Sequence, residues 1–196
     1  KKLKKKVSLQ FSLIYQLVFD YITYMEKGNF SKKLKPLILT LVLVIVDQVT
    51  KLWVMKTIPL NSIGYSFFGD FLYICHVRNT GAAFSMGATF PSFVRLLIFI
   101  IFPLVIVGAI IVMVVWEKSG LNTFQRWLCA GLAGGGIGTL IDRIFRFDQG
   151  VVDFVSVKFY GLFGLERWPT FNVSDSCVVV FVIILAISIL FEGKKE

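Results

Sequence analysis

Histidine is almost absent from this sequence: its 196 residues include one histidine, three cysteines and five prolines. With a single histidine and no paired cysteine motif, the residues do not predict a metal centre, and three widely spaced cysteines argue against a disulfide framework. Charged residues make up only 17% of the chain, whereas 56% of the residues are hydrophobic. This balance excludes an ordinary soluble domain and predicts a polytopic membrane protein.

The net charge of +9 is unevenly distributed along the chain. Nine of the 21 lysines and arginines lie in residues 1–35, which favours a cytoplasmic flank near anionic lipid over a nucleic-acid surface. We expect residues 1–33 to form a basic N-terminal extension, either an interfacial amphipathic helix or a segment foreign to the native protein. Residues 34–196 are then the membrane domain.

Four apolar stretches approach the ~20 residues that cross ~30 Å of hydrocarbon. They cover residues 37–55, 93–116, 127–145 and 173–191. An even number of spans places both ends of the chain on one side, and the basic flank makes that side cytoplasmic. The connections 56–92 and 146–172 then face outward. Their aromatic, β-branched and glycine-punctuated composition predicts short strands and turns.

Two carboxylates mark the second outer connection. Asp153 follows two valines, and Asp175 immediately precedes the last apolar stretch. A carboxylate beside hydrocarbon is costly to ionise and is rarely placed there without a role. Two such groups brought together share a proton, because like charges in close contact cannot both ionise. The pair predicts the chemistry of an aspartic protease.

Two further charged pairs accompany the spans. Asp47 and Lys51 are four residues apart on the first span, and two interpretations stay open: a structural ion pair that locks helix packing, or a direct role at the site. Arg143, at the outer end of the third span, can donate to substrate carbonyls or pair with the adjacent Asp142. Taken alone, the adjacency favours the pairing.

The third span contains a run of glycines. Gly131 and Gly135, like Gly134 and Gly138, have the spacing of small residues that permits close helix contact in membranes. A phosphate-binding loop is the alternative, but no Gly-Lys-Ser/Thr follows. We therefore expect this run to serve helix packing.

Five motifs, in order, resemble those of signal peptidase II, also called lipoprotein signal peptidase, a bacterial membrane aspartic protease. They are Asp47-Gln48-x-x-Lys51, Asn79-x-Gly81-Ala82-Ala83-Phe84-Ser85, Gly134-Gly135-x-x-Gly138-x-x-x-Asp142-Arg143, Val152-Asp153-Phe154 and Phe171-Asn172-x-x-Asp175. The resemblance covers roughly residues 34–192. It implies four transmembrane helices with a small extracytoplasmic β-cradle, which fits residues 57–90, in the bacterial inner membrane.

The resemblance also implies roles for individual residues. Asp153 and Asp175 correspond to the catalytic pair, and no cofactor or metal is expected. Substrate-binding positions are Asn79, Gly81, Thr139, Arg143 and Asn172, the last also supporting the pair. The implied substrates are prolipoprotein signal peptides, cut just before a cysteine that carries diacylglycerol.

Two positions depart from the family pattern. Thr139 stands where asparagine is usual, which removes an amide from the expected substrate contact, and Ser174 stands where alanine is usual.

Two other functions compete with the protease hypothesis. An ion-coupled transporter would use membrane carboxylates, but both acids lie at the ends of spans rather than near the midplane. A non-catalytic assembly factor would use the glycine-rich span alone.

Overall fold

The structure is a computed structural model that describes residues 33–81 and 86–192. The compact unit comprises Pro36–Glu196. The predictions for the extension 1–33 fall almost wholly outside the described residues.

The helices follow the predicted apolar stretches. They are α3 (Pro36–Thr57), the run of α4 (Ser92–Leu96), η2 (Leu97–Ile101) and α5 (Phe102–Val115), then α6 (Thr123–Phe145) and α7 (Val173–Glu192). In the described part of the chain, these are the four segments long and apolar enough to cross a membrane. The prediction of four spans is therefore confirmed.

The third span begins four residues before its predicted start. The side chain of Asn122 accepts a hydrogen bond from the backbone N–H of Gln125, and the Gln125 side chain accepts one from the backbone N–H of Asn122. This reciprocal cap starts α6 at Thr123, before the apolar stretch itself begins.

The second span is irregular near its N-terminal end. Pro103 follows the π-helical turn η2, and its ring lacks the N–H that would bond to the carbonyl of Phe99. A wider turn relieves this conflict. The irregularity matters because Phe99 and Pro103 both line the cavity described below.

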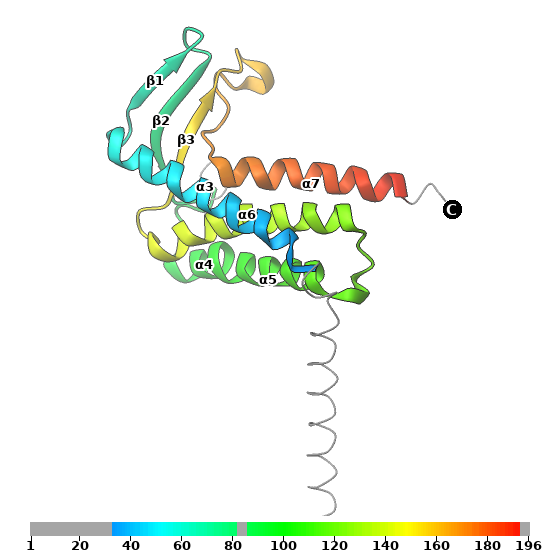
Figure 1. Cartoon of the computed structure of the whole chain (residues 1–196). Helices are drawn as coiled ribbons and strands as arrows, with labels where there is room; N and C mark the ends of the chain where they lie inside the picture. The colour runs from blue at the N-terminus through cyan, green and yellow to red at the C-terminus, as the bar shows by residue number, and fades with distance from the viewer. Residues whose placement is uncertain (1–32, 82–85, 193–196) are drawn as a thin grey trace, which may run out of the picture. The chain divides into compact units, whose positions relative to one another are not determined.

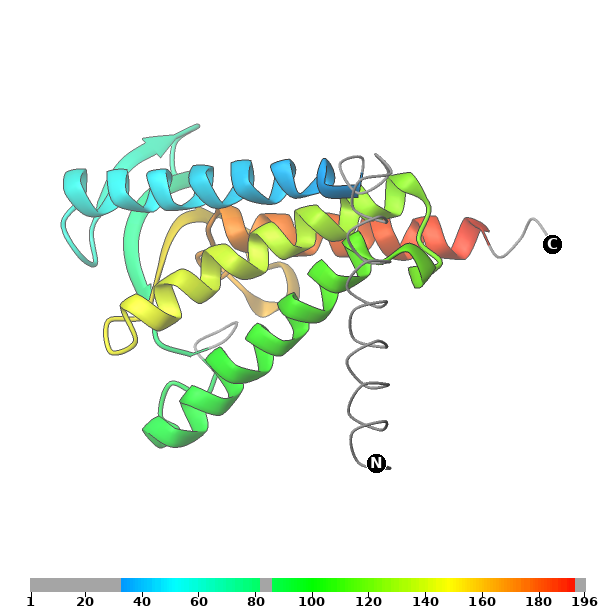
Figure 2. The same cartoon turned by 60° about the horizontal axis from the view of Figure 1, so that its bottom comes forward.

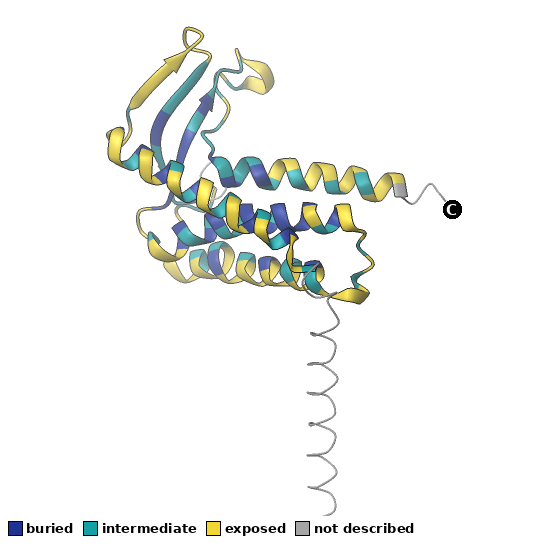
Figure 3. Ribbon diagram, in the orientation of Figure 1, coloured by how far each residue is buried: buried dark blue, intermediate teal, exposed yellow. Residues whose placement is uncertain are grey.

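Helix α6 is the centre of the bundle. In the 18-residue apolar stretch of α6, 61% is buried inside the protein, against 22% or less in the corresponding stretches of the other three spans. Figure 3 shows buried residues gathered along α6. A Cβ at Gly134 would lie 3.2 Å from the carbonyl oxygen of Thr40 on α3, and one at Gly135 would lie 2.7 Å from that of Ser174 on α7. The expected close helix contact is confirmed, and the helical glycine run leaves no loop for a phosphate.

A small antiparallel sheet adjoins one end of the bundle. Its strand order is β1 (Ile63–Phe67), β2 (Leu72–Asn79) and β3 (Val151–Val157). The sheet lies where α3 and α6 end and where α4 and α7 begin (Figures 1 and 2). The opposite end of the bundle holds the connection containing η3 (Glu117–Ser119). The predicted combination of four spans and a small sheet is thus confirmed.

Candidate active site

Strand β3 and the start of α7 bring the two candidate acids to one place. Asp153 lies in the buried part of β3, and the backbone N–H groups of Phe154 and Val155 both donate to the carbonyl oxygen of Phe171, at 3.0 and 2.8 Å. This contact holds the chain entering α7 against the strand. Asp175, in the first turn of α7, therefore faces the same region as Asp153.

Asn172 connects the two acids. Its Nδ2 donates to Asp153 Oδ1 at 2.7 Å and to the carbonyl oxygen of Val152 at 3.3 Å. Its Oδ1 accepts from the backbone N–H of Asp175 at 3.0 Å, and its own N–H donates to Asp175 Oδ2 at 3.0 Å. Asn172 thus caps α7 and fixes Asp153 with one fully buried side chain.

A cavity of about 840 Å³ contains both acids. Its walls combine polar groups from the sheet with apolar groups from α5, α6 and α7. The lining residues from the helices are Phe99, Pro103, Gly136, Thr139, Leu140, Arg143, Asp175, Val178 and Val179. The polar residues from the strands and connections are Arg78, Asn79, Asp153, Arg167 and Thr170.

Four of the five predicted substrate-binding residues line this cavity: Asn79, Gly81, Thr139 and Arg143. The side chain of Asn79 bonds to Asp153 and also accepts from the backbone N–H of Gly81 at 3.0 Å. The fifth, Asn172, is fully buried behind the acids, so its contacts are those of a supporting residue.

Arg143 does not pair with Asp142, as its adjacency had indicated. Instead it donates to the carbonyl oxygen of Gly81 and lies over the ring of Phe99, 4.9 Å from the ring centroid. Asp142 forms ion pairs with Lys51 and Arg146. Adjacent residues on a helix point in different directions, so Arg143 faces the cavity while Asp142 faces α3.

The pKa of Asp153 is raised from its ordinary 3.8 to about 7. Burial is the largest cause, because it disfavours the ionised form, and the negative charge of Asp175 adds to it. Hydrogen bonds from Asn172 and Asn79 and the charge of Lys51 act in the opposite direction. Asp153 therefore holds a proton up to neutral pH, which suits a group that donates to a reacting oxygen.

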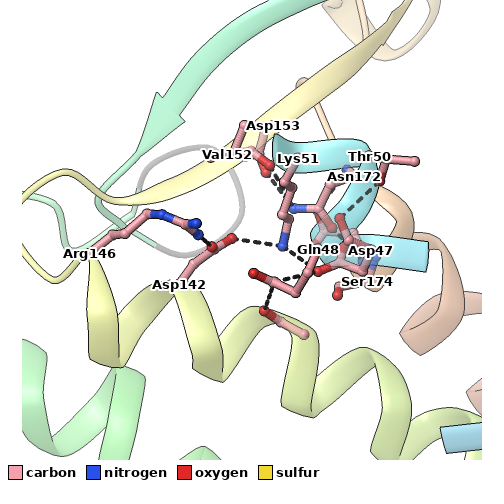
Figure 4. A network of polar contacts seen from close by, with 12 residues as sticks. Asp47, Gln48, Thr50, Lys51, Asp142, Arg146, Val152, Asp153, Asn172 and Ser174 are labelled. Carbon is pink, nitrogen blue, oxygen red and sulfur yellow. Dashed lines mark hydrogen bonds and ion pairs between the residues drawn. The ribbon is translucent and has the colours of Figure 1, made fainter. Parts of the chain in front are cut away.

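The predicted ion pair between Asp47 and Lys51 forms, with Lys51 Nζ 2.7 Å from Asp47 Oδ2. Lys51 is also 2.7 Å from Asp142 Oδ2 and is fully buried. Gln48 donates to Asp47 Oδ2 at 3.0 Å and to the carbonyl oxygen of Gly138 at 3.1 Å. Figure 4 shows this network, which joins Asp47, Gln48 and Lys51 of α3 to Asp142 of α6.

Arg167, which was not predicted from the sequence, also lies in the cavity wall. Arg167 donates to the carbonyl oxygens of Ser156 and Asp70, each at 2.8 Å, and lies over the ring of Tyr73. It thereby ties the connection before α7 to the β1–β2 hairpin. Its position beside Trp168, in a mostly apolar outer connection, was the available signal.

Among the described residues, no three histidine, cysteine, aspartate or glutamate side chains are grouped so that they could hold a metal ion. The chemistry available at the site is that of two carboxyl groups, amide donors and the guanidinium groups of Arg78, Arg143 and Arg167.

Comparisons with known proteins agree on one family. A family model described as "Signal peptidase (SPase) II" matches residues 39–191. The lipoprotein signal peptidase of Treponema denticola is 41% identical over 161 residues, covering 82% of this chain and 91% of that protein. The lipoprotein signal peptidase of Borrelia hermsii is 44% identical over 155 residues, covering 79% and 89%.

Two solved structures share the fold of this chain. A bacterial membrane enzyme solved by the in meso method at 2.3 Å is 27% identical and superposes with a TM-score of 0.68, covering 83% of this chain and 92% of that one. A second such structure, at 1.9 Å, is 28% identical with a TM-score of 0.65, covering 80% and 92%.

Proposed function

The chain belongs to the signal peptidase II family, and from this premise we propose that its catalytic type is aspartic, with Asp153 and Asp175 as the catalytic pair. As a member of this family it is a multi-pass bacterial membrane protease that removes signal peptides from prolipoproteins. That activity rules out the two alternatives, an ion-coupled transporter and a non-catalytic assembly factor.

The observation that carries the proposal is that Asn172 forms hydrogen bonds with both Asp153 and Asp175. Both acids line a cavity large enough for a peptide segment. We assign the shared proton to Asp153, whose pKa of about 7 keeps it neutral up to neutral pH. Asp175 then acts as the base. As in other carboxyl pairs, the apparent titration belongs to both groups together.

In the proposed reaction, Asp175 takes a proton from a water molecule while the oxygen of that water attacks the scissile carbonyl carbon. Asp153 gives its proton to the carbonyl oxygen, which produces a neutral tetrahedral diol. When the C–N bond breaks, Asp175 returns its proton to the leaving nitrogen and Asp153 recovers one from the diol. Asn79 and Arg143 hold the peptide backbone, Thr139 and Gly81 complete the cavity wall, and Asn172 orients the acids.

The substrate is a signal peptide joined to a diacylglyceryl cysteine, cut just before that cysteine. Support comes from the composition of the cavity, because sheet residues line one part and apolar helix residues such as Leu140 and Val178 line another. A cleavage site at the boundary between lipid and water requires such a surface. No cofactor or metal takes part.

The test uses purified protein with one prolipoprotein in two forms, with and without the diacylglyceryl group. Mass spectrometry should find a new N-terminal lipidated cysteine for the modified form only. Equal cleavage of the unmodified form would contradict the proposed substrate, and a different scissile bond would contradict the proposed position of cleavage.

The proposed orientation places both termini in the cytoplasm and the acids at the outer face of the inner membrane. The basic residues 1–35 precede α3, whose start lies at the same end of the bundle as η3, opposite the sheet. Single cysteines introduced at residues 155–165 should react with an impermeant reagent in intact cells, and those at 118–124 should not. The reverse pattern would contradict this orientation.

A further inference from the structure

A buried lysine lies behind the candidate acids. Lys51 has no exposed surface, and its Nζ is 2.7 Å from Asp47 Oδ2 and 2.7 Å from Asp142 Oδ2 (Figure 4). Asp142 in turn pairs with Arg146 one helical turn further along α6. A buried cation with two carboxylates is costly unless each charge is compensated, and here the two cations balance the two acids.

The two acids connect to the chain beside the cavity in different ways, Asp142 through its peptide bond to the next residue and Asp47 through a hydrogen bond. Asp142 directly precedes Arg143, which lies on the cavity wall. Asp47 Oδ1 accepts a hydrogen bond from the backbone N–H of Ser174 at 3.0 Å, and Ser174 directly precedes Asp175. The ammonium group of Lys51 therefore joins the backbone beside Arg143 to the backbone beside Asp175.

We propose that Lys51 is a positioning residue of the peptidase, which fixes Arg143 relative to Asp175 and biases the acid pair toward its singly ionised state. The inference rests on the proposed assignment of Asp153 and Asp175 as the catalytic pair. It assigns to the ion pair on α3 a role in the reaction besides helix packing.

The electrostatic part has a defined sign. Asp153 is faced by the carboxylate of Asp175, by the amides of Asn172 and Asn79, by Lys51 from α3 and by the guanidinium of Arg143 from α6. The charge of Lys51 lowers the pKa of Asp153, because a nearby cation favours the carboxylate. Removing that charge therefore moves the pH profile of cleavage to higher pH.

The experiment compares the pH dependence of cleavage in Lys51→Met with that of the unmodified protein. A directly paired cation shifts an acid by roughly 1–3 pH units, and because Lys51 is paired with Asp47 and Asp142 instead, we expect the alkaline limb to rise by less than this. Because Arg143 is then no longer fixed relative to Asp175, kcat should also fall by about 100-fold, with KM changed less than about threefold.

A second variant guards against loss of folding, because Lys51→Met leaves an uncompensated charge in the interior. Asp47→Asn/Lys51→Met removes one charge of each sign, keeps an oxygen for the Ser174 N–H and leaves Asp142 paired with Arg146. Its kcat should stay low because the link through Lys51 is still missing, whereas its alkaline limb should rise less than in Lys51→Met because the lost negative charge of Asp47 partly offsets the lost positive charge of Lys51. Lys51→Arg retains the charge and should keep the original limb. Lys56→Met, on the exposed last turn of α3, is the matched control and should change nothing.

A double variant with the kcat of the unmodified protein would show that Lys51 serves packing alone and would overturn the proposal. A shifted limb in Lys51→Arg would overturn it as well. Asp153→Asn and Asp175→Asn, assayed in parallel, separate the two proposals. If either of these retains cleavage, the catalytic pair is wrong; if both are inactive and the Lys51 profiles do not move, only the role of Lys51 is wrong.

Discussion

Asp153→Asn should make the protein more stable at neutral pH while abolishing cleavage. The carboxyl group of Asp153 is 4% exposed, and its pKa lies at about 7 in the folded protein against an ordinary 3.8. An asparagine has nearly the same shape, and its Oδ1 can still accept the hydrogen bond that Asn172 donates to Asp153 Oδ1. The substitution thus removes the ionisation and little else.

The sign of the effect follows from proton binding. Between pH 4 and 7 the folded protein holds a proton on Asp153 that the unfolded chain has released, so stability falls as pH rises through this window. The difference between 3.8 and about 7, at ~1.36 kcal/mol for each pKa unit, corresponds to about 4 kcal/mol at most. Above pH 7 the asparagine variant avoids this cost.

The free energy of unfolding, followed by tryptophan fluorescence in detergent at pH 4 and pH 8, measures the effect. The stability of the variant relative to the unmodified protein should increase by about 3–4 kcal/mol between the two pH values. Asp148→Asn, at an exposed position after α6, is the matched control and should show no such change. If the unfolding free energies of Asp153→Asn and the unmodified protein differed by the same amount at pH 4 and at pH 8, the raised pKa of Asp153 and the reasoning built on it would be refuted.

Substitutions at three positions on α6 test the cavity wall and its packing. Thr139→Asn should keep kcat/KM, whereas Thr139→Val should lower it by the equivalent of about 1 kcal/mol, the value of one lost hydrogen bond; equal rates would show that Thr139 does not contact substrate. Arg143→Lys should lower kcat/KM further, because a point charge cannot both stack on Phe99 and bond to the Gly81 carbonyl as a planar guanidinium does. Gly138→Ala should lower the melting temperature, at a cost of roughly 1–3 kcal/mol, because the new Cβ would lie 2.6 Å from Asp47 Oδ2; an unchanged melting temperature would contradict this packing.

The spans and strands could be predicted because their signals are local. Apolar stretches of spanning length located α3, α7 and the continuous span from α4 to α5 to within two residues, and alternation with glycine punctuation located the strands. The start of α6 could not be found from hydropathy, since its first turn is polar and owes its helix to the Asn122–Gln125 cap.

Contacts between distant segments were the part that the sequence could not provide. The spacing of Asp47 and Lys51 predicted their ion pair, but the second partner of Lys51 lies on another helix, so no spacing indicates it. The same limit explains the wrong pairing of Arg143 with Asp142, because adjacency in sequence says nothing about which neighbouring element each side chain faces. Local motifs therefore located the candidate site, while its supporting network needed the fold.

The most direct test of the central claim is the cleavage rate of one diacylglyceryl prolipoprotein by Asp153→Asn and Asp175→Asn. Each variant should insert into the membrane normally and cleave at least ~10³-fold more slowly than the unmodified protein. The reason is that the reaction needs both carboxyl groups, one ionised as the base and one protonated as the acid. Asp148→Asn should cleave at the normal rate. If either of the first two variants cleaved within about tenfold of the unmodified protein, Asp153 and Asp175 would not be the catalytic pair.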